Sequence, residues 1–312
     1  MTVEANAKVN LSLEVYGRRA DGYHELRSIV LPISLADDLS IEVAADGGIS
    51  SDSGYGEKDL VVRAARALRD ACPSVARMGA KVYVDKRIPV GGGLGGGSAD
   101  AAATLRALNE AWGLGLAPER LAEIGALVGS DVPALVLAQH FRAPVLMEGR
   151  GERVGRRDAG EREALSVGGL GGWMVLANPG VESSTVEVYS RCVPRGDAPS
   201  GDFDAFAAPV NDLQAAACAL HPEIASALAA MMVAGAKGVM MSGSGSTVFG
   251  FADGLDDAAR VAAAMESVGC RAWLARSTSH MEEGDKWLAS ASADAPLWYN
   301  TRCDADIRIR GR

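Results

Sequence analysis

Apolar and polar residues alternate near the start of the chain, over residues 5–15. One face of this segment is formed by Ala7, Val9, Leu11, Leu13 and Val15. Lys8 and Asn10 fall on the opposite face, because successive side chains of a strand point to opposite sides. The pattern predicts a half-buried strand. Lys8 is then either a solvated strand charge or, together with Asn10, one of two polar groups at the mouth of a site.

A turn signal, Asp21-Gly22, follows this strand. Residues 25–35 are again strand-like, so the pattern predicts a hairpin with Tyr23 and His24 at the start of its second strand. An aromatic ring beside an imidazole can stack on a base and hydrogen-bond it, or it can pack as a hairpin corner. These residues alone leave both interpretations open.

Periodic segments continue along the chain. Helices are predicted behind Asp59 and Pro118 and over 98–111, 211–219, 222–234 and 256–265, and strands over 39–43, 80–86, 173–177, 239–241, 248–251 and 271–275. A Gly-, Arg- and Glu-rich stretch over 149–171 marks a predicted boundary between two lobes. Residues 281–312 show no periodic core face and are interpreted as an appended tail. The predicted parts are therefore 1–150, 151–280 and 281–312.

The most distinctive stretch is rich in glycine and lies between a predicted strand and a predicted helix. It consists of Pro89, Val90, Gly91, Gly92, Gly93, Leu94, Gly95, Gly96, Gly97, Ser98 and Ala99. Glycines let the backbone turn through positive φ and approach a ligand closely, and Ser98 is a suitable N-cap for the helix. Bare N–H groups and the positive end of the helix dipole then point at one spot, which suits a phosphate.

A dinucleotide-binding turn, a P-loop and a flexible linker each fit this stretch less well. Gly91, Gly93 and Gly96 satisfy G-x-G-x-x-G, but a dinucleotide fold places that motif after its first strand, with an acid after the next strand. A P-loop requires a lysine before the serine, where this chain has Gly97-Ser98. A flexible linker is disfavoured, because a strand and a capped helix bound the loop.

Two further segments are candidates for chemistry. Asp131 lies between a glycine and a proline in the sequence Gly129-Ser130-Asp131-Val132-Pro133, at the edge of an apolar run, so its position is well defined. It can serve as a helix cap, as a catalytic group or as both. Residues 242–247 form a second Gly/Ser loop between predicted strands, which is either a second anion cradle or a tight hairpin.

Composition narrows the classes of function. The chain has 312 residues, 48% of them hydrophobic, and a net charge of −9, which argues against binding a nucleic-acid backbone. It contains no apolar run long enough to span a membrane and no N-terminal secretion signal. Its five cysteines are far apart, which predicts a reduced, cytoplasmic setting without structural zinc.

Three segments in one order, residues 5–11, 89–103 and 242–251, resemble the GHMP kinase superfamily. The resemblance implies an α+β fold of two lobes with the active site in the cleft between them. It implies ATP as phosphate donor, bound by residues 89–99, together with Mg²⁺, whose ligands the sequence does not identify. It also implies a small-molecule acceptor, no nucleic-acid or membrane partner, and a monomer or a homodimer.

Residues 7–11, 19–24 and 129–133 are similar to those of one branch of the superfamily, which phosphorylates the 2-hydroxyl of a cytidylated methylerythritol. A homoserine or mevalonate type of kinase is the alternative, although those acceptors lack a base for Tyr23 and His24 to bind. The resemblance implies that Asp131 is the general base and Lys8 its partner. It implies that Asn10, Tyr23, His24 and Thr185 line the acceptor site. Asp59 stands where the family often has asparagine.

Overall fold

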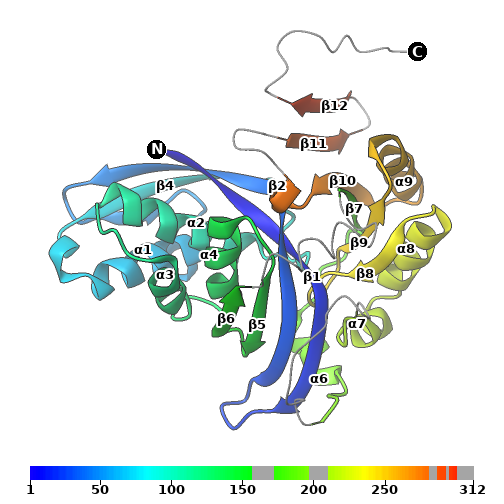
Figure 1. Cartoon of the computed structure of the whole chain (residues 1–312), viewed down its shortest axis with the longest axis horizontal. Coiled ribbons are helices and arrows are strands. Elements are labelled where there is room, and N and C mark those ends of the chain that lie inside the picture. The colour runs from blue at the N-terminus through cyan, green and yellow to red at the C-terminus, as the bar shows by residue number, and fades with distance from the viewer. Residues whose placement is uncertain (157–171, 197–209, 281–286, 293–294, 301–312) are drawn as a thin grey trace.

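The computed structural model describes residues 1–156, 172–196, 210–280, 287–292 and 295–300. Its longest elements are two antiparallel strands, β1 (Thr2–Arg18) and β2 (His24–Ala44). The predicted hairpin is present, but its second strand continues through the segment 39–43, for which the sequence predicts a separate strand. Both strands run through the middle of the molecule (Figure 1).

Strand β1 is buried on both faces, so the prediction of a half-buried strand is wrong. Residues 7–16 of this strand are all buried. Lys8 is 4% exposed and Asn10 is 1% exposed. The pairing of β1 with β2 shifts register between Asn6 and Lys8 and again between Asn10 and Ser12. Such irregularities re-aim side chains locally.

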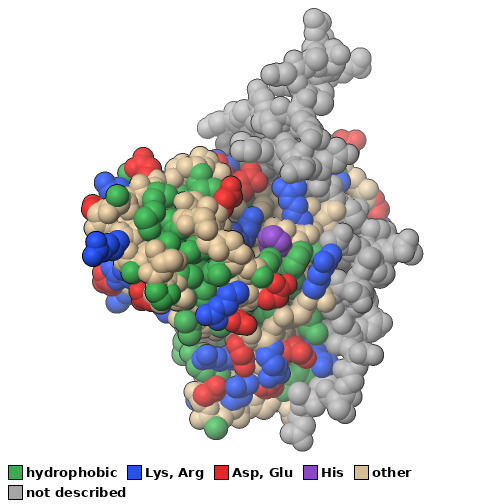
Figure 2. All heavy atoms as spheres, turned by 60° about the vertical axis from the view of Figure 1, so that its left-hand side comes forward, with side chains coloured by type: hydrophobic (Ala, Val, Ile, Leu, Met, Phe, Trp, Pro, Cys, Tyr) green, Lys and Arg blue, Asp and Glu red, His purple; other side chains and the backbone are tan. Residues whose placement is uncertain are grey.

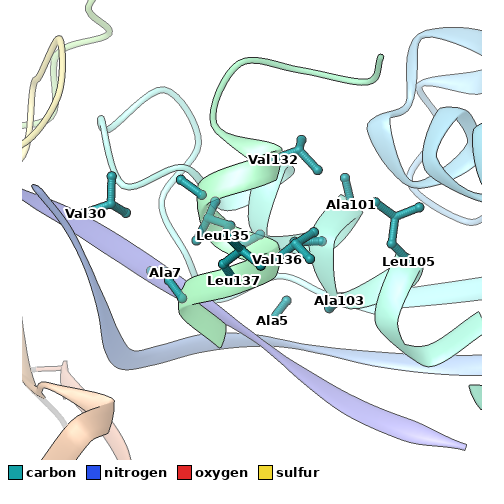
Figure 3. Packing of buried hydrophobic residues seen from close by; sticks show 14 of the residues in the cluster. Ala5, Ala7, Val30, Ala101, Ala103, Leu105, Val132, Leu135, Val136 and Leu137 are labelled. Atoms are coloured by element: carbon teal, nitrogen blue, oxygen red, sulfur yellow. The ribbon is translucent and has the colours of Figure 1, made fainter. Parts of the chain in front are cut away.

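The N-terminal unit is a sheet in the order β3-β4-β2-β5-β6, with β1 also paired to β2. Its elements are β3 (Ile49–Ser51), β4 (Gly79–Asp85), β5 (Val145–Gly149), β6 (Arg153–Arg156), α1 (Leu60–Ala71), α2 (Gly96–Ala111), α3 (Pro118–Gly125) and α4 (Val132–Phe141), with short 3-10 turns at Gly56–Lys58 and Pro73–Val75. Figure 3 shows why α4 is packed closely. Its Leu135 and Val136 lie among small residues, Ala101 and Ala103 of α2 and Ala5 of β1.

The C-terminal unit is a four-stranded antiparallel sheet in the order β10-β7-β9-β8. Its elements are β7 (Trp173–Asn178), α6 (Thr185–Arg191), α7 (Gln214–Leu220), α8 (Pro222–Val233), β8 (Lys237–Met241), β9 (Val248–Ala252), α9 (Leu255–Ser267), β10 (Arg271–Arg276) and a 3-10 turn at Thr278–His280. Leu13 and Val15 of β1 belong to the core of this unit, whereas Val9 and Leu11 belong to the first core. Strand β1 therefore ties the two units together.

The predicted lobe boundary and tail are only partly described. Strands β5 and β6 extend the first sheet to Arg156, and the rest of the 149–171 stretch lies mostly outside the described residues. In the tail, β11 (Trp287–Ser292) and β12 (Ala295–Asn300) form a two-stranded antiparallel sheet that sequence periodicity does not indicate. The division at residues 150 and 280 stays a prediction.

On the face that Figure 2 shows, acidic and basic side chains are interspersed. Within the described residues, no single helix is long and apolar enough to cross a membrane. Helices α7 and α8 are long and apolar enough only when they are taken together, and they are bent by 118° relative to each other.

Candidate active site

The glycine loop enters helix α2 through backbone conformations that favour glycine. Gly91, Gly93 and Gly95 have φ values of 70°, 76° and 70°. Helix α2 begins at Gly96, and Gly95 occupies its N-cap without a side-chain hydrogen bond, so the prediction that Ser98 is the N-cap is wrong. The N–H groups of the first turn therefore have no capping side chain, and they can bind an anion.

The second Gly/Ser loop supports the first one. The Ser242 hydroxyl donates a hydrogen bond of 3.0 Å to the carbonyl of Gly93, and the Thr247 N–H donates one of 3.1 Å to the carbonyl of Gly92. A Cβ at Gly93 would lie only 2.1 Å from the Ser242 carbonyl oxygen. Ser242 and Thr247 are also hydrogen-bonded across a tight turn. The hairpin alternative therefore describes this loop, and its role as a second anion cradle stays a prediction.

Lys8 and Asp131 meet beside the glycine loop. The Lys8 ammonium nitrogen lies 3.5 Å from Oδ2 of Asp131. It also donates hydrogen bonds to Oδ1 of Asn10 at 2.6 Å and to the carbonyl of Gly93 at 3.0 Å. Asn10 is held in turn by Ser28, whose hydroxyl accepts a hydrogen bond from its amide at 2.8 Å. The ammonium is therefore fixed between the phosphate loop and the carboxylate.

Asp131 occupies the N-cap position of α4, but its side chain makes no capping hydrogen bond. The carboxylate therefore faces Lys8 and solvent, and it is 35% exposed. The preceding turn is held by Gly151, at which a Cβ would lie 2.2 Å from the Ser130 carbonyl oxygen. The carboxylate is thus well positioned yet open to a ligand.

The hairpin end of β2 reaches the same site. Tyr23 is 50% exposed, and His24 stacks on Tyr189 of α6 with ring centroids 5.3 Å apart and an interplanar angle of 28°. Burial, with a smaller contribution from Arg18, lowers the pKa of the His24 imidazole, so it is neutral at neutral pH. The Thr185 hydroxyl lies 2.8 Å from that of Ser244, which links α6 to the second loop.

Tyr189 was missed by sequence reasoning. The available signal was an aromatic residue four positions after Thr185, which the resemblance already places at the acceptor site. Burial raises the pKa of its phenol, so the hydroxyl stays protonated. A stacked pair of an aromatic ring and an imidazole offers a flat surface on which a planar base can pack.

A buried ionic cluster below the glycine loop was also missed. The Lys86 ammonium bridges the carboxylates of Asp37 and Asp100. Asp37 is fully buried, and it also accepts hydrogen bonds from the N–H groups of Arg87 and Ile88, which lead into the loop. Burial raises the pKa of the Asp100 carboxyl to about 7, although Lys86 acts in the opposite direction.

Asp59 caps helix α1, as its sequence position predicts. One carboxylate oxygen accepts a hydrogen bond of 2.9 Å from the Val61 N–H, and the other accepts one from the Ser53 hydroxyl. Asp59 and Ser53 both line the cavity between the two units. The acid that stands in place of the family's asparagine is therefore satisfied within the protein.

The glycine loop, the Lys8–Asp131 pair and the hairpin end of β2 line one cavity of about 1190 Å³, to which Thr185 and Tyr189 of the C-terminal unit also contribute. The predicted residues that line it are Lys8, Asn10, Tyr23, His24, Pro89, Val90, Gly91, Gly92, Gly93, Gly95, Gly96, Gly97, Ser98, Asp131 and Thr185. Leu94 and Ala99 are instead buried in the core behind the loop. The structure thus brings the phosphate loop, the Lys8–Asp131 pair and the hairpin together, while the roles of individual residues stay predictions.

Comparisons with known proteins agree with this arrangement. Residues 59–139 match the GHMP kinases N terminal domain, and residues 195–269 match the GHMP kinases C terminal domain. A 4-diphosphocytidyl-2-C-methyl-D-erythritol kinase of Geobacter sp. (strain M21) is 40% identical over 286 residues, which cover 87% of this chain and 95% of that protein. The corresponding kinase of Pelotomaculum thermopropionicum is also 40% identical, covering 84% and 93%.

Solved structures show the same relationship. A crystal structure of 4-(cytidine 5'-diphospho)-2C-methyl-D-erythritol kinase is 35% identical, with a TM-score of 0.72, and the match covers 88% of this chain and 98% of that one. A mevalonate kinase shares the fold at 13% identity, with a TM-score of 0.64. The chain therefore belongs to the GHMP kinases and, within them, to the family of 4-diphosphocytidyl-2-C-methyl-D-erythritol kinases.

Proposed function

We propose that this protein transfers the γ-phosphoryl group of ATP to the 2-hydroxyl of the erythritol moiety of 4-diphosphocytidyl-2-C-methyl-D-erythritol. The observation that carries the proposal is one cavity that joins a glycine loop, a lysine–carboxylate pair and a stacked histidine–tyrosine pair. The names of the relatives supply the identity of the acceptor.

The glycine loop is the proposed site of the ATP phosphates. Its residues 91–97 expose N–H groups at the start of α2, where the helix dipole is positive. Because phosphoryl transfer requires mainly alignment and charge neutralisation, a fixed ring of N–H donors can contribute much of the catalysis. The contacts from Ser242 and Thr247 keep this ring in place.

Asp131 is the proposed general base. It would accept the proton of the acceptor hydroxyl while the hydroxyl oxygen bonds to the γ-phosphorus and the bond from that phosphorus to the ADP oxygen breaks. Lys8 would compensate the carboxylate charge and the negative charge on the transferred group. Its position, between Asp131 and the Gly93 carbonyl, supports both parts of this role.

Mg²⁺ is a proposed cofactor. Among the described residues, no three His, Cys, Asp or Glu side chains form a metal cluster. This fits Mg²⁺, which is usually held by substrate phosphates, water and only one or two protein oxygens. Ser98 supplies a hard oxygen donor at the start of α2 in the cavity and could hold the ion. When bound, the ion would neutralise charge on the phosphates.

The acceptor's cytosine is proposed to lie against Tyr23, His24 and Tyr189. A neutral His24 can offer one ring nitrogen as a hydrogen-bond donor and the other as an acceptor. Asn10 and Thr185 line the path from these rings toward the catalytic pair. An acceptor without a base, such as homoserine or mevalonate, would leave the aromatic end of the cavity unused.

All of these residues come from one chain, so a monomer or a homodimer would suffice. The cysteines of the described residues, Cys72, Cys192, Cys218 and Cys270, are free thiols, which supports our proposal of a cytoplasmic location.

Phosphate transfer from ATP to a panel of alcohols tests the proposed function. We expect rapid, acceptor-dependent ADP release with the cytidylated methylerythritol, and product phosphorylated at its 2-hydroxyl. Homoserine and mevalonate serve as matched acceptors without a base. Equal or faster transfer to either of them would contradict the proposal.

A further inference from the structure

Arg150 lies in the turn between β5 and β6 and lines the hairpin end of the cavity. Its guanidinium carbon is 5.3 Å from the centroid of the Tyr23 ring, within the range of a cation–π contact. The mechanism proposed above gives this cation no role.

Two glycines hold the turn that carries Arg150. Gly149 pairs with Leu26 in the register of β5 with β2, close to His24. Gly151 has a φ of 115° and contacts the backbone of Ser130, so closely that any side chain there would clash. Arg150 is therefore anchored between the proposed cytosine site and the turn that positions Asp131.

The carboxylates nearest to this turn are engaged by other groups. Glu152 accepts a hydrogen bond of 2.6 Å from the main-chain N–H of Arg150, and it lies 3.6 Å from the Arg19 guanidinium. Asp21 accepts hydrogen bonds from Arg19 and from the Tyr23 N–H, and its interaction with Arg150 is electrostatic. The guanidinium N–H groups of Arg150 are therefore available to a ligand in the cavity.

The other cations that line the cavity are placed differently, and among them Lys58 ends the 3-10 turn that precedes helix α1. Lys8 is held by Asn10, Gly93 and Asp131, and Lys86 is held by two buried carboxylates below the glycine loop. Arg18 donates to the Gly22 carbonyl at the tip of the hairpin. Among the described residues, Arg150 is thus the arginine that is anchored between the Tyr23 ring and the Lys8–Asp131 pair.

We propose that Arg150 binds the diphosphate of the acceptor and so selects a nucleoside diphosphate over a nucleoside. The proposal rests on the proposed function, in which the base lies at one end of the acceptor and the reacting hydroxyl at the other, with the diphosphate between them. The planar guanidinium of arginine matches two phosphate oxygens at once. Its contact with Tyr23 would hold it ready before the acceptor arrives.

Competitive inhibition at saturating ATP tests this role, with cytidine diphosphate and cytidine as paired probes against the acceptor. For Arg150→Ala we expect inhibition by cytidine diphosphate to weaken about 10- to 100-fold, the loss typical of a charged hydrogen bond. Inhibition by cytidine and the KM for ATP should stay within about twofold of wild type, which ordinary experimental scatter covers. Arg150→Lys keeps the positive charge but loses the planar pair of N–H donors. Its inhibition by cytidine diphosphate should therefore lie between that of wild type and that of Arg150→Ala.

Arg153→Ala is the matched control, because Arg153 is 56% exposed, pairs with Glu25 and does not line the cavity. It should leave the ratio of the two inhibition constants unchanged, and thermal melting should show that all variants are folded. An unchanged ratio in Arg150→Ala would overturn the inference while leaving the proposed function intact. Failure of wild-type protein to phosphorylate the cytidylated acceptor would instead contradict the proposed function.

Discussion

The ammonium nitrogen of Lys8 lies 3.5 Å from Oδ2 of Asp131 and, at the same time, 3.0 Å from the carbonyl oxygen of Gly93. One buried cation therefore links the proposed catalytic carboxylate to the phosphate loop. In the proposed mechanism, the acceptor hydroxyl, the carboxylate that accepts its proton and the transferred phosphate would all lie close to this one ammonium group.

Asp131→Asn should reduce kcat at least about 100-fold, because the amide cannot take up the proton of the acceptor hydroxyl. The side chain makes no capping hydrogen bond, so we expect the fold and the KM for ATP to change little. Steady-state kinetics with the cytidylated acceptor measure the effect, and thermal melting provides the control. Near-normal turnover would remove Asp131 from the mechanism.

Gly93→Ala should raise the KM for ATP and lower the free energy of unfolding by about 2 kcal/mol or more, from left-handed strain and the clash of its Cβ with the Ser242 carbonyl. Gly113→Ala is the matched control. Gly113 also has positive φ, 66°, but a Cβ there would meet nothing within 4 Å. Urea unfolding and ATP kinetics of both variants would be compared, and equal effects would show that the contact between the two loops is unimportant.

Tyr189→Leu should raise the KM for the acceptor about tenfold while leaving the KM for ATP unchanged, because stacking of a base on an aromatic ring contributes about 1–3 kcal/mol. Tyr189→Phe keeps the ring that stacks on His24 and should behave like wild type. Initial rates at varied acceptor and ATP concentrations separate the two KM values. A rise in both by the same factor would indicate a general disturbance of the cavity.

Asp100→Asn should change how stability depends on pH. The folded protein holds the Asp100 proton up to a pKa of about 7, mainly because of burial, whereas the unfolded chain releases it near pH 4. Between these values unfolding releases a proton, so this group makes the free energy of unfolding fall as the pH rises, and its contribution is lost above pH 7. The variant lacks this contribution.

Urea melts at pH 5, 6, 7 and 8 measure the effect as a difference between variant and wild type. The free energy of unfolding of the variant should gain on that of wild type as the pH rises toward 7, and the difference should then level off. Taking the difference cancels the contributions of His24 and His140, whose pKa values are lowered mainly by burial and act in the opposite direction. Parallel curves would show that Asp100 is ionised throughout this range.

Much of the local structure could be predicted because it depends on near neighbours in the chain. The strand over residues 5–15, the cap at Asp59 and the helix behind the glycine loop are all present. The predicted start of α2 was wrong, because the backbone conformation of the folded loop outweighed the capping preference of one residue type. Ser98 is a good N-cap by type, yet the positive φ of Gly95 starts α2 two residues before it.

The sequence by itself determined most of the strands and helices and the glycine loop, and it identified Lys8 and Asp131 as candidates, because periodicity and glycine content act over a few residues. It did not indicate the short strands β3, β5 and β6 or the tail strands β11 and β12. Only the tertiary structure decided that Tyr189 stacks on His24, that Lys86 is shared by Asp37 and Asp100, and that Gly93 packs against Ser242. These contacts depend on the register of β1 with β2 and on the close approach of the two units. Such relationships join distant segments, and no local pattern of side chains encodes them.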